Sequence, residues 1–301
     1  MKRLKIEALA KSVPEMRVSN DDLAEFIETS DEWISQRTGI KTRRVSLFDN
    51  TSDLCAKAAK ELLSKTSTEA SEIDLIIVAT MTPDSATPST AAIVQGKIGA
   101  KNAVAFDISA ACSGFVYALV TAASMLDSKH AKKALVIGGE VLSKSLDWSD
   151  RTTCVLFGDG AAGALIDCDF DGDSALLGYS LKSFGEDSDK LSCQKTLPLA
   201  KFPPESNKKT ATPFEMDGRA VYNFTTKIVP AVIKAAVEDS GLELDQIDRF
   251  VLHQANARII KVIAKKLHQP LEKFPENISE YGNTSGASIP LLLSELSEQK
   301  E

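Results

Sequence analysis

The sequence has few of the residues that build metal centres or disulfide frameworks. Its 301 residues include only three histidines and five cysteines, and no two cysteines form a Cys-x-x-Cys pair. Widely spaced cysteines argue against a zinc site and against disulfides, and they are typical of a reducing compartment. We therefore expect no bound metal.

The chain is also poor in aromatic residues and has no excess of positive charge. Aromatics make up 6% of the residues, and 35 basic against 42 acidic side chains leave a net charge of −7. Nucleic-acid binding favours stacking aromatics and basic surfaces. Both values therefore argue against a nucleic-acid partner.

Long hydrophobic runs are missing as well. Charged side chains interrupt residues 1–17, so this segment has no apolar stretch of signal-peptide length. The most apolar helical stretch, residues 112–126, is shorter than the ~20 residues that cross a bilayer. We expect a soluble, cytoplasmic protein without a membrane partner.

What the sequence does contain is an alternation of apolar strand and helix patterns. Strands are expected at 74–80, 103–109, 134–140 and 161–168, and helices at 88–99 and 112–126. Continuous apolar strands between helices predict an α/β protein whose parallel-rich sheet is covered on both faces. The pattern then restarts, with helices at 217–239, 256–267 and 285–298 and a strand at 249–255.

This restart predicts two similar halves, 1–170 and 171–301, separated by a polar surface excursion at 185–213. If the halves are duplicates, the second lacks its last two strands. We expect that the sequence is an incomplete form of a longer protein, because the candidate catalytic residues described next are all retained. The alternative is a copy that is inactive and unstable on its own.

A cysteine occupies a position suited to a nucleophile. In DISAACSGF (107–115), Cys112 follows a buried strand and opens an apolar helix, among small residues that admit a ligand closely. A helix N-terminus lowers a thiol pKa, so a thiolate could form here. A buried cysteine that only packs as a small hydrophobe is an equally good interpretation of this segment alone.

Two further polar residues lie at element boundaries. His253 ends the predicted strand 249–255, and Asn283 lies in the turn YGNTSGAS. Taken alone, His253 is better explained as a core histidine and Asn283 as a turn-capping asparagine. Ligands of α/β sheets bind at the carboxyl ends of strands, so Cys112 and His253 share one edge. Together the three residues could hold an acyl group as a thioester and hydrogen-bond a second thioester during decarboxylation.

Five segments in order carry a resemblance: DEWISQRTGI, FDISAACSGF, LFGDGA, HQANARII and YGNTSGAS. They resemble β-ketoacyl-acyl-carrier-protein synthase III, the initiating condensing enzyme of type II fatty-acid synthesis. The resemblance implies a thiolase-like five-layer αβαβα sandwich, assembled as a homodimer. It also implies that Cys112 takes an acetyl group from acetyl-CoA, while His253 and Asn283 hold the malonyl thioester of malonyl-acyl-carrier protein. Acyl-CoA is a substrate, so no cofactor is implied.

The resemblance assigns substrate-binding roles as well. It implies that Trp33 and Arg151 enclose the adenine of coenzyme A, and that Arg37 meets its phosphates. Ala255 and Asn256 would line the pantetheine tunnel. The acyl pocket would be formed by Thr87, Leu142 and Phe157. The carrier-protein surface would consist of Gln254, Arg258, Lys261 and Lys265. The last three are spaced along one helical face and form a basic patch suited to an acidic carrier.

Two departures from the family pattern matter. Thr87 stands where the best-known members have a phenylalanine that closes the acyl pocket across the dimer. Because threonine is smaller, we expect the pocket to admit longer primers, supplied by acyl-CoAs other than acetyl-CoA. The missing C-terminal strands include a glycine-rich loop that supplies an oxyanion-hole N–H.

Other functions stay open at this point. A related acyltransferase of polyketide or quinolone synthesis would share the same residues. A papain-like thiol hydrolase also uses Cys, His and Asn, and a non-catalytic paralogue would bind acyl-CoA without being acylated.

Overall fold

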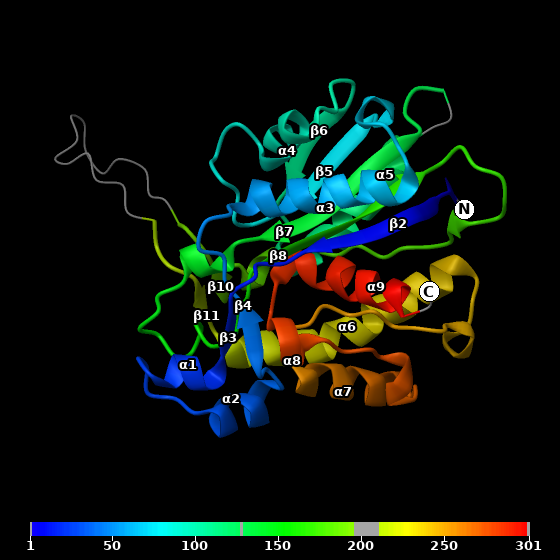
Figure 1. The fold of residues 1–301 in the computed structure, drawn as a ribbon. Helices are drawn as coiled ribbons and strands as arrows, with labels where there is room; N and C mark the ends of the chain where they lie inside the picture. The colour runs from blue at the N-terminus through cyan, green and yellow to red at the C-terminus, as the bar shows by residue number, and fades with distance from the viewer. Residues whose placement is uncertain (1, 127–128, 196–210, 300–301) are drawn as a thin grey trace, which may run out of the picture.

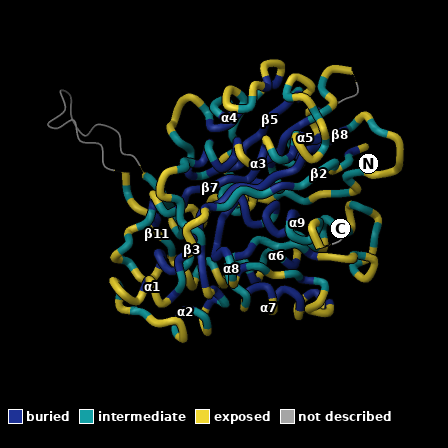
Figure 2. Tube along the Cα trace, viewed as in Figure 1, coloured by how far each residue is buried: buried dark blue, intermediate teal, exposed yellow. Residues whose placement is uncertain are grey.

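The computed structural model describes residues 2–126, 129–195 and 211–299 (Figure 1). Its main sheet has the strand order β2-β8-β7-β5-β6. The strands span β2 (Lys5–Ser12), β5 (Leu75–Ala79), β6 (Val104–Ile108), β7 (Lys133–Glu140) and β8 (Gly160–Asp167). The four expected strands are confirmed, and the sheet lies at the centre of the buried region (Figure 2).

The sheet is mixed, which differs in part from the parallel-rich expectation. β5 runs parallel to β6 and β7, whereas β8 runs antiparallel to both β7 and β2. Between β7 and β8 the chain forms only a short 3₁₀ helix, Leu142–Ser145, and no α-helix that could carry it across the sheet, so β8 returns in the opposite direction. β2 was not expected because charged residues interrupt its apolar pattern, which an edge strand tolerates.

Helices cover both faces of this sheet. The first face packs against α3 (Thr51–Thr66) and α4 (Thr90–Ile98), and the second against α5 (Gly114–Met125) and α9 (Ser288–Glu298). Side chains of β5 alternate accordingly: Ile76 contributes to the first apolar cluster and Ile77 to the second. The sheet is therefore buried on both sides, as expected for continuous apolar strands.

The second half forms a helical layer beyond α9. Helices α6 (Gly218–Ser240) and α7 (Ala257–Leu267) pack on each other around an apolar cluster, and α9 lies between them and the sheet (Figure 1). The helices expected at 217–239, 256–267 and 285–298 are confirmed.

The prediction of a strand at 249–255 is wrong, because this segment pairs with no strand in the described part of the chain. Its Phe250 N–H donates instead to the Lys273 carbonyl at 2.8 Å. A strand needs a neighbour, and none of the strands in the described ranges lies beside this segment.

Short elements complete the fold. They are α1 (Asn20–Ala24), α2 (Asp31–Thr38), α8 (Ile278–Tyr281) and the strand pairs β1 (Lys2–Arg3) with β9 (Ala175–Leu176), β3 (Arg17–Ser19) with β4 (Thr42–Arg44), and β10 (Leu191–Ser192) with β11 (Glu215–Met216). Within the expected excursion 185–213, residues 196–210 lie outside the described residues. In the described ranges, no helix has both the length and the apolar character that a bilayer crossing requires.

Candidate active site

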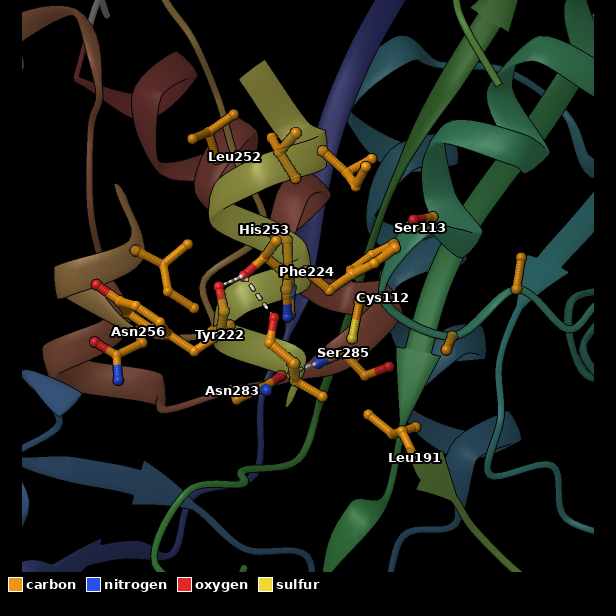
Figure 3. A pocket seen from close by; sticks show the side chains of 18 of the residues that line it. Cys112, Ser113, Leu191, Tyr222, Phe224, Leu252, His253, Asn256, Asn283 and Ser285 are labelled. Atoms are coloured by element: carbon orange, nitrogen blue, oxygen red, sulfur yellow. Dashed lines mark hydrogen bonds between the residues drawn. The ribbon is translucent and has the colours of Figure 1, made fainter. Parts of the chain in front are cut away.

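A single cavity of about 780 Å³ brings together the three residues expected to carry chemistry. Cys112, His253 and Asn283 all line it, together with residues of α5, α6 and the segment before α7 (Figure 3). Met81, which follows β5, also lines the cavity. The cavity therefore lies beyond the carboxyl ends of β5 and β6, where ligands of α/β sheets bind.

The backbone around Cys112 is tightly constrained. A 3₁₀ turn, Ala111–Ser113, connects β6 to α5, and Ala111 has a left-handed φ of 44°. Such a conformation is strained for a residue with a side chain and is often found at functional sites. Gly114 follows, and a Cβ there would lie 3.0 Å from the Ala79 Cβ. A small residue thus lets the first turn of α5 pack against β5 and hold Cys112 at the cavity wall.

Burial governs the acidity of the Cys112 thiol. Desolvation raises its pKa to about 11, and the negative charge of Glu140 adds to this rise, while a hydrogen bond with Ser285 opposes it. The expected net lowering of the thiol pKa is therefore wrong, because desolvation outweighs the hydrogen bonds, including one from the backbone, that lower it. The thiol needs a proton acceptor before it can attack.

His253 is half-buried, but its two ring nitrogens are fully buried and unbonded. Within the described chain, neither ring nitrogen has a hydrogen-bond partner. Burial lowers its pKa to about 4, so the imidazole is neutral at pH 7. A buried polar group without a partner in the protein is ready to bond a ligand atom. No thiolate–imidazolium pair with Cys112 is present, which argues against the papain-like alternative.

Asn283 is held on both sides by the LFGDGA segment. Its N–H donates to the Leu156 carbonyl at 2.9 Å, and its carbonyl accepts from Gly158 N–H at 3.0 Å. The side-chain Oδ1 accepts from the Ser285 N–H at 2.9 Å. This bond identifies Oδ1 as the acceptor, so Nδ2 is the group that remains to donate to a ligand.

Three other expected residues, Phe157, Ala255 and Asn256, also line the cavity. Asn256 is the N-cap of α7: its Oδ1 accepts from Arg258 N–H at 2.8 Å, and its Nδ2 donates to the Arg37 carbonyl at 2.9 Å. Asn256 thus joins the cavity wall to α2.

The expected coenzyme A residues gather on the surface at α2. The Arg37 guanidinium carbon lies 4.6 Å from the centre of the Trp33 ring, and that of Arg151 lies 5.6 Å away. Arg151 also donates to the Glu28 carbonyl at 2.8 Å. Two cations therefore contact one indole in the geometry of cation–π pairs, outside the lining of the cavity.

The remaining expected residues are divided between surface and core. Thr87 is exposed and does not line the cavity, while Leu142 is buried behind Phe157. The expected carrier-protein contact of Gln254 is not supported: this side chain is 1% exposed, and its amide bonds Leu252 and Asn277 internally. The three basic residues of α7 that were expected to contact the carrier protein are exposed: Arg258, Lys261 and Lys265.

Sequence reasoning missed two buried polar residues and most of the apolar wall. Glu140 closes the apolar strand β7, where an acidic residue after two glycines was an unused signal. Ser285 follows Asn283 in the turn, with a left-handed φ of 48°. The apolar wall comes mainly from Phe184, Leu191, Phe214, Met216, Phe224 and Ile228. Within the described ranges, no group of three or more His, Cys, Asp or Glu side chains could hold a metal ion.

Comparisons with known proteins agree with one another. Two family models, 3-oxoacyl-[acyl-carrier-protein] synthase III and its C-terminal part, match residues 106–185 and 237–301. The chain is 52% identical over 295 residues to the β-ketoacyl-[acyl-carrier-protein] synthase III of Limosilactobacillus reuteri, covering 98% of this chain and 90% of that protein.

Solved structures give the same family. The 3-oxoacyl-[acyl-carrier-protein] synthase III of Aquifex aeolicus has a TM-score of 0.90 at 39% identity, covering 99% of this chain and 91% of that one. The priming β-ketosynthase of the R1128 polyketide pathway has a TM-score of 0.88 at 30% identity, covering 98% and 87%. These likenesses confirm the expected thiolase-like fold, and the chain belongs to the 3-oxoacyl-[acyl-carrier-protein] synthase III family.

Proposed function

We propose that this acyltransferase condenses an acyl-CoA with malonyl-acyl-carrier protein in the cavity lined by Cys112, His253 and Asn283. The convergence of these three side chains on one cavity, in a chain of this family, is the observation that carries the proposal. The reaction initiates fatty-acid synthesis and gives acetoacetyl-acyl-carrier protein when the primer is acetyl-CoA.

The first step is transfer of the acyl group. The Cys112 sulfur attacks the thioester carbonyl of acyl-CoA, the new C–S bond forms, and coenzyme A leaves as its thiolate. The strained turn at Ala111 holds the sulfur at the cavity wall, so little conformational freedom is lost on the way to the transition state.

The second step is decarboxylation and condensation. The neutral His253 imidazole and the Asn283 Nδ2 donate hydrogen bonds to the thioester oxygen of the malonyl group, where negative charge develops as CO₂ leaves. The enolate carbon then attacks the acyl-Cys112 carbonyl, forming the C–C bond and releasing the Cys112 thiolate. Apolar walls keep water away from the acyl-enzyme.

Surface residues bind the two thioester carriers. Trp33 and Arg151 hold the adenine of coenzyme A and Arg37 its phosphates, once the adenine displaces the arginine contacts on the indole. Ala255 and Asn256, at the cavity wall, hold the pantetheine arm. The exposed basic residues of α7, Arg258, Lys261 and Lys265, dock the acidic carrier protein in the cytoplasm.

The acyl pocket accepts primers longer than acetyl. The volume of about 780 Å³ belongs to the whole cavity, including the wall at Ala255 and Asn256 assigned to pantetheine, so the proposal of longer primers rests on Thr87. Thr87 is exposed outside this cavity, so it acts by entering the cavity of a second copy in a homodimer, where a threonine leaves more room than a phenylalanine. Thr87→Phe should therefore shorten the longest primer accepted.

Intact-mass measurement with a series of acyl-CoAs tests the proposal. We expect one acyl adduct, lost in Cys112→Ala and retained in Cys168→Ala, a partly buried cysteine outside the cavity lining. Adducts that survive Cys112→Ala would overturn the assignment of the nucleophile. Release of free acid without carrier protein would favour the hydrolase alternative. Binding of acyl-CoA without acylation would favour the non-catalytic paralogue.

A further inference from the structure

A proline interrupts the helix that forms one wall of the cavity. Pro230 lies inside α6, between turns that both contribute residues to the cavity. Because proline has no N–H, the carbonyl of Thr226, four residues earlier, has no α-helical donor, and the proline ring pushes this carbonyl away from the helix axis. Thr226 is only 7% exposed. A buried carbonyl is normally paired, so this one requires a donor from elsewhere in the protein.

Lys266 of α7 is that donor. Its Nζ donates to the Thr226 carbonyl oxygen at 2.8 Å. Hydrogen bonds from charged donors are among the stronger ones in proteins. Lys266 directly follows Lys265, and one residue turns an α-helix by about 100°, so its side chain leaves the face shared by Arg258, Lys261 and Lys265. The fourth basic residue of α7 therefore bonds the neighbouring helix.

The joint between Thr226 and Pro230 is the anchored part of α6. These two are the buried residues of the helix, whereas residues 218–225 are half-buried or exposed. Thr226 Oγ1 also donates to the Tyr222 carbonyl at 2.9 Å, which ties the preceding turn to the same joint. The position of the first two turns of α6 therefore depends on how this joint is held.

Those first turns contribute side chains to the cavity. Tyr222, Phe224 and Thr225 line it, and Figure 3 shows Tyr222 and Phe224 among the side chains around Cys112. A tilt of the helix about the joint would move these side chains relative to the thiol. The room left for a thioester arm would change with them.

We propose that Lys266 is a positioning residue of the cavity. By bonding the Thr226 carbonyl that Pro230 leaves without a donor, it fixes the α6 wall against which acyl-CoA binds. The inference rests on the proposed function, because it takes acyl-CoA as the ligand of this cavity. Lys266 does not line the cavity and acts through Thr226 and the turns before it. Its role differs from that proposed for Lys261 and Lys265, which dock the carrier protein.

Lys266→Met tests the inference, because methionine keeps most of the side-chain length and cannot donate. Loss of a hydrogen bond from a charged group should raise the KM for acetyl-CoA in Cys112 acylation about tenfold. The acylation rate at saturating acetyl-CoA should stay within about twofold of that of the parent, as expected when only binding is lost. Partial unfolding would lower the maximal rate and leave KM unchanged, so the split separates positioning from loss of folding.

Lys266→Arg is the conservative variant. Arginine keeps a charged donor at the same position, so its KM for acetyl-CoA should stay within about threefold of that of the parent. A tenfold rise in Lys266→Arg as large as that in Lys266→Met would contradict a role as hydrogen-bond donor.

Pro230→Ala provides a matched background. Alanine restores the backbone N–H at this position, so the Thr226 carbonyl regains a helical donor, and Pro230 itself does not line the cavity. In this background, adding Lys266→Met should raise the KM at most about twofold, against about tenfold in the parent. An equal rise in both backgrounds would overturn the inference, because the effect would then not depend on the orphaned carbonyl.

Lys234→Met controls for the loss of a positive charge. Lys234 is exposed on α6 and lies outside the lining of the cavity, so this variant should leave the KM for acetyl-CoA unchanged. If Lys266 instead contacts the carrier protein, Lys266→Met would raise the KM for malonyl-carrier protein and leave that for acetyl-CoA unchanged. That result would overturn the inference.

Calorimetric titration with acetyl-CoA in the Cys112→Ala background repeats the comparison without acyl transfer. The dissociation constant should follow the same pattern: about tenfold weaker binding in Lys266→Met, and at most about twofold when Pro230→Ala is also present. Acylation of the parent with no change of KM or dissociation constant in Lys266→Met would overturn the inference alone. Binding without acylation of Cys112 in the parent would contradict the proposed function, and the titration would still decide the role of Lys266. Absence of acetyl-CoA binding in the parent would contradict both.

Discussion

Gly138 of β7 lies directly against the backbone of Gly286, in the turn that follows Asn283. A Cβ built on Gly138 would be 2.1 Å from the Gly286 carbonyl oxygen and 3.2 Å from the Ala287 Cα. These contacts are with backbone, which cannot rotate away as a flexible side chain can. The central sheet therefore fixes the position of the turn that holds two polar residues of the site, Asn283 and Ser285.

Gly138→Ala should accordingly displace this turn. We expect a loss of about 1–3 kcal/mol in the free energy of unfolding, from overpacking, together with a strong loss of condensation activity. Gly96→Ala is the matched control, because Gly96 is exposed in α4 and a Cβ there meets nothing within 4 Å. It should be neutral or stabilising by up to about 1 kcal/mol. Urea unfolding and a coupled condensation assay measure both effects. A parent-like Gly138→Ala would contradict the contact.

Much of this fold could be predicted because its signals are local. Apolar runs such as 74–80 are strands wherever a sheet buries both faces, and the amphipathic pattern at 256–267 forms a helix with Asn256 as its N-cap. Segment 249–255 shows the limit of this reasoning. Its residues favour a strand, yet strand formation depends on a neighbouring strand, which lies outside local sequence.

The site was predictable in its residue types but not in its electrostatics. Motifs singled out Cys112, His253 and Asn283, and the fold places them on one cavity. The pKa of Cys112 depends on how deeply its sulfur is buried and on Glu140, a residue from another strand. Gln254 shows the same limit, because a polar residue next to His253 was expected at a surface and is buried.

Burial of His253 should make stability depend on pH. Its pKa is about 4 in the folded chain, below the ordinary 6.5, so its contribution is full above pH 6.5 and is lost as pH falls toward 4. His253→Leu removes this term. Relative to that of the variant, the free energy of unfolding of the parent should fall by about 2 kcal/mol between pH 7 and pH 5. Urea unfolding at the two pH values measures it.

The comparison with the parent is essential because Glu140 acts in the opposite direction. Its pKa is raised to about 7 from 4.5, so its stabilising contribution is present below pH 4.5 and is lost as pH rises through 7. That contribution is present in both proteins and cancels in the difference. His268→Asn, at an exposed helix end that tolerates asparagine, controls for removal of a histidine. An equal pH dependence in His253→Leu and the parent would contradict the burial argument.

Asn283→Asp should separate the two chemical steps. Aspartate can still accept the Ser285 N–H bond, so the turn should stay in place, but it cannot donate to a thioester oxygen. We expect condensation to fall by about 10²–10³, the effect of removing one oxyanion donor. Acylation of Cys112 should stay within a few-fold of the parent. Intact mass follows the acyl-enzyme, and CO₂ release follows decarboxylation. A parallel loss of both would show that Asn283 has a mainly structural role.

The basic face of α7 should govern affinity for the carrier protein only. Lys261 and Lys265 are exposed, whereas the Arg258 guanidinium is bonded to the Gln36 carbonyl, so the two lysines can be changed with least effect on folding. Lys261→Glu combined with Lys265→Glu should raise the KM for malonyl-carrier protein about tenfold, more at low salt, without changing the rate of Cys112 acylation by acyl-CoA. Lys60→Glu, an exposed position on α3 beyond the opposite face of the sheet, should leave both values unchanged. Equal effects of the α7 and α3 variants would mean that only the net charge of the enzyme affects carrier-protein binding, which would contradict a docking face on α7.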